Sequence, residues 1–110
     1  MLKIYYTEEP ANVPSLTGKG QAALITYPNP FVDEISIIFR IDRKEKIHLG
    51  VYNLLGQQIE IITRGVQSPG RYHVKWDVTD RSGKAVPNGM YYIILDIGKD
   101  RQVTKIMKTR

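Results

Sequence analysis

The sequence predicts an all-β fold, an antiparallel sandwich of about seven strands in two sheets. Short runs of apolar and β-branched residues recur about every ten residues from residue 22 onward, and turn-forming residues separate them. No long segment shows the apolar period of about 3.6 residues that an amphipathic helix needs. With 110 residues, 42% of them hydrophobic, the chain fits one folded domain, which we place at residues 22–110.

Residues 1–21 are expected to form a linker or an arm from a preceding region. Residues 7–21 contain two prolines and two glycines and lack a hydrophobic period. Residues 1–6 hold one lysine and a brief apolar stretch, which fits neither a signal peptide nor a membrane span. If the natural protein is exported, we therefore expect its export signal further upstream and this chain to be a fragment.

The first two strands of the domain are predicted at residues 22–27 and 34–41. Pro28, Asn29 and Pro30 stop the first strand, because proline removes ladder donors and forces an extended kink. The second strand alternates with a period of two, so one of its faces should point into the core. The residues on that face are Ile35, Ile37, Phe39 and Ile41.

The next two strands are predicted at residues 46–52 and 58–63, joined by a turn at residues 53–56. Gly56 can adopt the positive φ that such a turn needs. A single helical turn at residues 53–55 is the most helix that we expect. The residues expected to face inward are Ile47, Leu49 and Val51.

Trp76 is the expected core anchor of the fifth strand. Tyr72, Val74 and Trp76 alternate there with His73 and Lys75, so the first three side chains should face inward. The histidine and the lysine should face outward.

The last two strands are predicted at residues 90–97 and 101–108, after a polar loop at residues 77–88. Residues 98–100 should form a tight hairpin connection between them. The first of these strands is apolar enough to be central and covered on both faces. In the second, Ile106 lies opposite one row of side chains, which indicates a bulge or a one-sided edge. That row consists of Val103, Lys105 and Met107.

The formal net charge is +5, but the basic residues are dispersed. They gather at residues 40–46 and 101–110, where acidic residues interrupt them, and no run reaches five like charges. We interpret them as solvated strand ends and edge guards rather than a phosphate-binding stripe. Gly-rich phosphate loops are absent from the sequence. We predict no nucleic-acid partner and no cofactor.

No catalytic residues are predicted. A hydrolase needs a nucleophile with a base, or two carboxylates set across a cleft. His48 and His73 fall on different predicted strands, and His73 should point outward as an ordinary solvated histidine. The chain has no cysteine, which excludes a thiol nucleophile and a Cys-based zinc site. The domain is therefore not expected to be an enzyme on its own.

Two other kinds of site stay open at this point. Oxygen atoms of Asp77, Asp80 and Asn88 could bind one weak Ca²⁺, but such side chains more often form Asx-turns, so we predict no metal site. Aromatic side chains raise the alternative of a carbohydrate-binding module, or of an adhesion or packing module, accessory to a secreted enzyme. These aromatic residues are Tyr72, Trp76, Tyr91 and Tyr92.

Five blocks of sequence follow one another in a recognisable order. They are Tyr27-Pro28-Asn29-Pro30-Phe31, Tyr52-Asn53-Leu54-Leu55-Gly56, Trp76-Asp77, Asn88-Gly89-Met90-Tyr91-Tyr92 and the basic ending from Lys105. Through these blocks, residues 22–110 resemble the type A C-terminal sorting domain of the type IX secretion system of Bacteroidetes. They also resemble a relative of that domain, the immunoglobulin-like module of flagellar hook-capping proteins. The resemblance implies an immunoglobulin-like sandwich.

The resemblance implies a non-catalytic C-terminal domain that directs the export of a larger protein. The expected partners are a preceding cargo domain, the outer-membrane secretion machinery and a sortase-like protease that cuts within the arm. The expected destination is the cell surface or the medium, reached through the periplasm and the outer membrane. The residues expected to be recognised are Lys105, Ile106, Met107, Lys108 and Arg110. A mainly structural role is implied for Tyr27, Pro28, Asn29, Pro30, Phe31, Tyr52, Asn53, Gly56, Trp76, Asp77, Gly89 and Tyr91.

A physical argument supports recognition of the last strand. A C-terminal edge strand offers unpaired backbone groups to which a partner could add a strand, and nearby cations could orient that partner. The competing interpretation is that Lys105 and Lys108 only guard the edge against aggregation.

Overall fold

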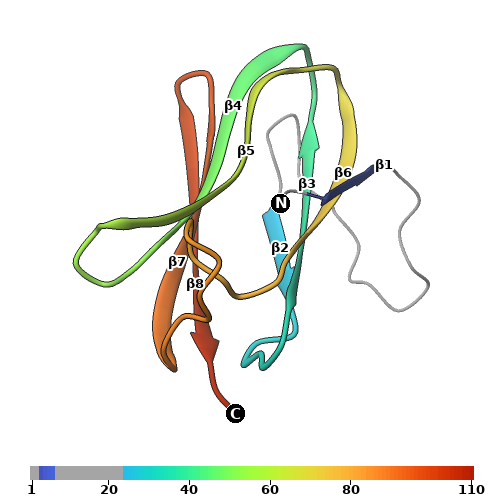
Figure 1. Cartoon of the computed structure of the whole chain (residues 1–110). Helices are drawn as coiled ribbons and strands as arrows, with labels where there is room; N and C mark the ends of the chain where they lie inside the picture. The colour runs from blue at the N-terminus through green and yellow to red at the C-terminus, as the bar shows by residue number, and fades with distance from the viewer. Residues whose placement is uncertain (1–2, 7–23) are drawn as a thin grey trace.

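The structure, a computed structural model, describes residues 3–6 and 24–110. Within these residues, eight strands form two four-stranded sheets (Figure 1). They are β1 (Lys3–Tyr6), β2 (Leu24–Tyr27), β3 (Ile35–Ile41), β4 (Glu45–Tyr52), β5 (Gln58–Gln67), β6 (Gly70–Trp76), β7 (Gly89–Ile97) and β8 (Asp100–Lys108). Seven of these strands lie within residues 22–110, which confirms the predicted all-β sandwich. No helix in the described ranges is long and apolar enough to cross a membrane.

The two sheets have the strand orders β1-β6-β3-β2 and β5-β4-β7-β8. All neighbouring strands are antiparallel. Because β3 pairs with β6 and β4 pairs with β7, each sheet joins strands that are not consecutive in the chain. The chain therefore crosses between the sheets several times, with the Greek-key connections expected of an immunoglobulin-like sandwich. Figure 1 shows β7 and β8 in one layer and β3 and β6 in the other.

β1 lies inside the segment expected to be an arm, residues 1–21. It pairs with β6, from Lys3 opposite Lys75 to Tyr6 opposite Tyr72. The arm thus contributes an edge strand to the first sheet. The rest of the expected arm lies outside the described residues.

The inward faces predicted for three strands are confirmed. Side chains of a strand point alternately to the two sides of its sheet, and the alternate residues named above are buried between the sheets. They are Ile35, Ile37, Phe39, Ile41, Ile47, Leu49, Val51, Tyr72, Val74 and Trp76. Trp76 is 2% exposed, as expected for the core anchor.

Three aromatic rings meet where β6 ends and β7 begins. The Trp76 ring lies 6.0 Å from the ring of Phe31 and 6.2 Å from the ring of Tyr91, with the latter pair edge to face. The indole Nε1 of Trp76 donates to the carbonyl of Thr79 at 2.9 Å. The hydroxyl of Tyr91 donates to the carbonyl of Pro87, four residues earlier, at 2.6 Å. This last bond is the tyrosine corner found in many immunoglobulin-like domains.

Two predicted turns are confirmed. Oδ1 of Asn53 accepts hydrogen bonds from the amides of Leu55 and Gln57, both at 2.9 Å, and Gly56 has a φ of 82°. This segment is an Asx-turn without a helical turn. At the other turn, Gly98 has a φ of 55° in a two-residue hairpin loop that joins β7 to β8.

Several expectations about the strands are wrong in detail. β7 is central, but only one of its faces is covered: Tyr91, Ile93 and Leu95 are buried, whereas the alternating residues are half-buried on the outer side of the sheet. An antiparallel sheet can expose one face, so an apolar run does not require cover on both. β8 has no bulge against β7, and the register shifts occur instead between β4 and β5. The other expected alternative is correct, since β8 is an edge strand that pairs with β7 on one side. β5 continues four residues beyond its predicted end, to Gln67.

His73 is not the ordinary solvated histidine that was expected. It lies on the outer side of its sheet but is half-buried, with its ring 6.5 Å from the ring of Tyr27. Burial lowers the pKa of His73, the positive charge of Lys75 lowers it further, and Glu34 partly opposes both effects. The alternation that predicts the direction of a side chain does not report how much of it is covered.

Candidate recognition strand at the C-terminus

The side chains expected to be recognised point to different sides of β8. Ile106 is fully buried in the core. Met107 is 42% exposed and Lys105 is exposed, both on the outer side, where Val103 is 52% exposed. Arg110 is exposed beyond the end of the strand. β8 therefore presents an outer row, which we define as Val103, Lys105 and Met107, while Ile106 fixes the strand to the sandwich.

Lys108 is held by a neighbouring segment. Its Nζ donates to the side-chain oxygen of Asn88 at 2.9 Å, and Asn88 directly precedes β7. The Lys108 side chain is half-buried, unlike that of Lys105. The two lysines of the last strand thus have different surroundings, and only Lys105 extends from the outer row.

Asn29 pairs with the backbone of β8 from the side opposite β7. Its Nδ2 donates to the carbonyl of Lys105 at 3.1 Å, and its Oδ1 accepts from the amide of Met107 at 2.9 Å. Two residues later, the amide of Phe31 donates to the carbonyl of Met107 at 2.9 Å. The carbonyl of Phe31 then accepts from the amide of Thr109 at 2.8 Å. We call Asn29–Pro30–Phe31 the clasp.

The clasp corrects one expectation about the last strand. Backbone groups along the end of β8 were expected to be unpaired and open to strand addition. In the structure, four of them, on Lys105, Met107 and Thr109, already have partners in the clasp. The sequence signal for this contact is weak, because the asparagine binds backbone groups, which every residue type carries.

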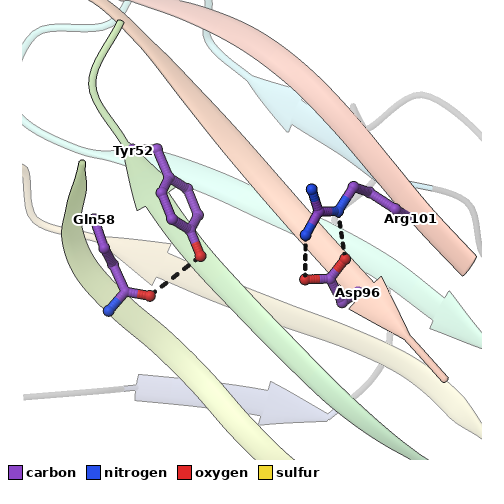
Figure 2. A network of polar contacts seen from close by, with 4 residues as sticks. All are labelled: Tyr52, Gln58, Asp96 and Arg101. Carbon is purple, nitrogen blue, oxygen red and sulfur yellow. Dashed lines mark hydrogen bonds and ion pairs between the residues drawn. The ribbon is translucent and has the colours of Figure 1, made fainter. Parts of the chain in front are cut away.

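Polar contacts order the outer side of the same sheet (Figure 2). Arg101 donates from Nε to Oδ1 of Asp96 at 2.7 Å and from Nη2 to Oδ2 at 3.3 Å. This bond and the charge of the carboxylate raise the pKa of the Arg101 guanidinium. The hydroxyl of Tyr52 donates to Oε1 of Gln58 at 3.1 Å. These contacts join β7 to β8 and β4 to β5 at the surface.

A shallow cavity of about 700 Å³ lies near the hairpin loop of β7 and β8. The charged or titratable side chains that line it are Lys46, His48, Arg64 and Asp96. His48 belongs to β4, whereas His73 belongs to β6 in the other sheet, so the fold does not bring the two histidines together. The cavity lies away from the clasp, at the start of β8 rather than its end.

The three side chains considered as calcium ligands have separate partners. Oδ1 of Asp80 accepts bonds from the amide and hydroxyl of Ser82 and from the amide of Lys84. Hydrogen bonds, first from the Ser82 hydroxyl and then from the Lys84 amide, lower the pKa of Asp80. Oδ1 of Asp77 accepts from the Thr79 hydroxyl, and Asn88 binds Lys108. No group of three or more metal-ligating side chains occurs among residues 3–6 and 24–110.

Three of the four aromatic side chains considered for sugar binding are buried. Tyr72, Trp76 and Tyr91 lie in the core, so their rings cannot stack on a sugar. Tyr92 is half-buried on the outer side of β7 and pairs across the strands with Tyr52 and Lys105. The aromatic residues considered for sugar binding are therefore core residues for the most part.

Comparisons with known proteins agree with the fold. The family model described as a secretion system C-terminal sorting domain matches residues 25–109. Dimeric latent PorU from Porphyromonas gingivalis has a similar structure, with a TM-score of 0.63 and 18% identity over 80% of this chain and 9% of that chain. PorZ, an essential surface component of the type-IX secretion system of the same organism, gives a TM-score of 0.58 and 19% identity over 79% and 11%.

FlgD from P. aeruginosa is similar over most of its own length. Its TM-score is 0.55, with 21% identity over 86% of this chain and 74% of that chain. The chain spans only about a tenth of the two Porphyromonas proteins. A comparison with curated proteins found no match.

Proposed function

Because the chain belongs to the family of secretion system C-terminal sorting domains, we propose that its last strand is the part that the secretion machinery recognises. The domain is a sorting signal of the type IX secretion system, and its family is in general not catalytic. A sorting domain of this system takes its protein across the outer membrane, to the cell surface or out of the cell. The sorting domain does not determine the activity of the protein that carries it.

The observation that carries this proposal is the outer row of β8. Val103 and Met107 expose apolar surface, with the cation of Lys105 between them and Arg110 beyond the strand. Ile106 holds the backbone in place, and Asn88 holds Lys108. A row of this kind suits a partner with an apolar surface and nearby carboxylates, because apolar contact supplies affinity while opposite charges set orientation.

Two further proposals concern the cargo and its separation from the domain. We propose that the preceding region is the cargo, and that a sortase-like protease removes the domain by cutting within residues 1–21. The membership of the chain in a C-terminal sorting family supports a position after a cargo region. The composition of residues 7–21, with two prolines and two glycines, suits an accessible cleavage segment.

The test follows a fluorescent reporter fused to the full chain, with an export signal, in a Bacteroidetes host. Deletion of residues 105–110 should leave the reporter inside the cell envelope, whereas the complete chain should send it outside. If the truncated fusion still reaches the outside, the terminal recognition site is wrong.

A charge reversal gives a finer version of the test. Lys105→Glu should lower export because it reverses the cation of the outer row. Lys99→Glu is the matched control, since Lys99 is exposed in the hairpin loop at the other end of β8. Equal export of the two variants would contradict a role for Lys105.

A further inference from the structure

We propose that Asn29 is a positioning residue whose hydrogen bonds occupy the backbone groups at the end of β8. The partner then contacts the side chains of the outer row and does not add a strand to the edge of β8. This inference rests on the proposed function, in which β8 is the recognised strand. In addition, Asn29, which lies near the start of the domain, takes part in recognition at its end. The partner binds through side chains of the outer row rather than by strand addition.

The Asn29 side chain acts as a short piece of β-ladder. A carboxamide has one donor and one acceptor side, like a peptide group, and Asn29 uses both on β8. The backbone of Phe31 continues the ladder with a donor and an acceptor of its own. Four successive groups of the strand edge are thereby paired: the carbonyl of Lys105, both groups of Met107 and the amide of Thr109.

The residues around Asn29 fix its position. Pro28 and Pro30 have restricted φ angles and no amide hydrogen. Phe31 is fully buried, with its ring against Trp76, so one end of the clasp is anchored in the core. Asn29 itself is exposed. Its two hydrogen bonds, rather than burial of its side chain, are therefore what it contributes.

The clasp decides which groups a partner can reach. A partner strand added to the end of β8 would first have to replace the four bonds of the clasp. The side chains of Lys105 and Met107 point to the outer side of the sheet and remain accessible while the clasp is closed. Recognition through the outer row therefore needs no rearrangement of the domain, whereas strand addition does.

Hydrogen exchange of the complete chain, measured by NMR, tests the geometry. Asn29→Ala should lower the protection of the Met107 amide by about tenfold or more, because this amide loses its acceptor. The Ile106 amide, which faces β7 in the antiparallel ladder, should stay protected. Asn29→Asp keeps an acceptor for Met107 but loses the donor to Lys105, so it should retain most of the Met107 protection.

Asn53→Ala is the matched control. It also removes an asparagine whose side chain binds two backbone amides, those of Leu55 and Gln57, in an exposed turn far from β8 in sequence. It should leave the protection of Met107 unchanged. Thermal unfolding of all variants shows whether their stabilities are comparable.

Reporter export then tests the role. Asn29→Ala should reduce export several-fold although every residue of the outer row is intact, because Lys105 and Met107 lose the bonds that hold their backbone in place. Asn29→Asp should restore part of the export, and Asn53→Ala should export normally. Higher export of Asn29→Ala would favour strand addition and overturn the inference. Normal export of Asn29→Ala, with Met107 deprotected, would overturn this inference while the 105–110 deletion still blocks export. Full protection of Met107 in Asn29→Ala would overturn it as well. Export of the 105–110 deletion would instead refute the proposed function itself.

Discussion

The ring of Phe31 packs against the ring of Trp76, with the two centroids 6.0 Å apart and the ring planes at 54°. Both side chains are buried. This contact joins two of the five sequence blocks described above, the one that ends at Phe31 and the one that begins at Trp76. Trp76 is also the last residue of β6. The clasp on the terminal strand and the tryptophan that anchors the core thus belong to one packed unit.

Trp76→Ala should therefore cost about 3 to 5 kcal/mol of unfolding free energy, because it removes a buried aromatic side chain and leaves a cavity. Urea unfolding followed by far-UV circular dichroism measures this, since Trp76 is the only tryptophan and its fluorescence is lost with it. Leu55→Ala is the control: Leu55 is 83% exposed, and its loss should change stability by less than about 0.5 kcal/mol. Similar costs for the two would contradict the placement of Trp76.

Tyr91→Phe should lower stability by about 1 kcal/mol at neutral pH, because the bond from its hydroxyl to Pro87 is lost. Burial raises the pKa of Tyr91 above the ordinary value of 10.0. The unfolded tyrosine then ionises first, so this contribution to stability falls as the pH rises through about 10. The difference between the wild type and Tyr91→Phe should narrow at alkaline pH.

Urea unfolding at neutral and at alkaline pH checks this expectation. Tyr92→Phe, on the outer side of the same strand, is the control and should keep the alkaline loss, since it retains Tyr91. A constant difference between the wild type and Tyr91→Phe at all pH values would argue against the effect of burial.

His73 should make the domain less stable in mild acid. Its pKa is lowered in the folded state, chiefly by burial, so the unfolded state binds a proton first as the pH falls below about 6.5. Stability should therefore decline from that pH down through the folded-state pKa. His73→Gln should flatten this decline, and His48→Gln should preserve it. The measurement is the melting temperature as a function of pH, and identical profiles for His73→Gln and the wild type would be the contrary result.

Gly98→Ala should destabilise the hairpin between β7 and β8 for two reasons. The φ of 55° lies in the left-handed region, which costs a residue with a Cβ about 1 to 2 kcal/mol. The added Cβ would also lie 2.8 Å from Oε2 of Glu45. The same substitution should cost less in a Glu45→Ala background, which a double-mutant cycle of urea unfolding measures. Equal costs in both backgrounds would mean that Glu45 moves away freely.

The sequence predicts the parts of the fold that depend on local alternation. In β4 and β6 the buried apolar residues recur at every second position, and in β3 they do so except for Ile38, which is buried on the other face. A strand can bury such an alternating set only on one face. Gly56 and Gly98 mark turns for an equally local reason, since glycine tolerates positive φ. These features need no knowledge of distant contacts.

Features that depend on distant contacts are harder to predict. The apolar run of β7 could not reveal that its outer face is half-buried, because that depends on which other elements lie against that face. The strand-stopping role of Asn29 between two prolines is visible in the sequence, but its bonds to the backbone of β8 are not. The side chain of an exposed asparagine can form hydrogen bonds with the backbone of any residue, and the fold determines which backbone groups lie close enough.

The function could be predicted mainly from the ordered blocks rather than from any single residue. The residues of the terminal site were identified by their position at the end of the chain, which does not distinguish the buried Ile106 from the exposed Lys105 and Met107. That distinction comes from the pairing of β8 with β7, whose register decides which side chains point inward.

The bond between Asn29 and Met107 joins residues 78 positions apart. During synthesis, Met107 emerges long after Asn29, so the bond cannot form until the chain has been made through Met107. Contacts of such long sequence separation form only after a large loop has closed, which places this one late in folding. Closure of the clasp would then follow assembly of the rest of the sandwich, and a chain cut short before Met107 could not form this bond.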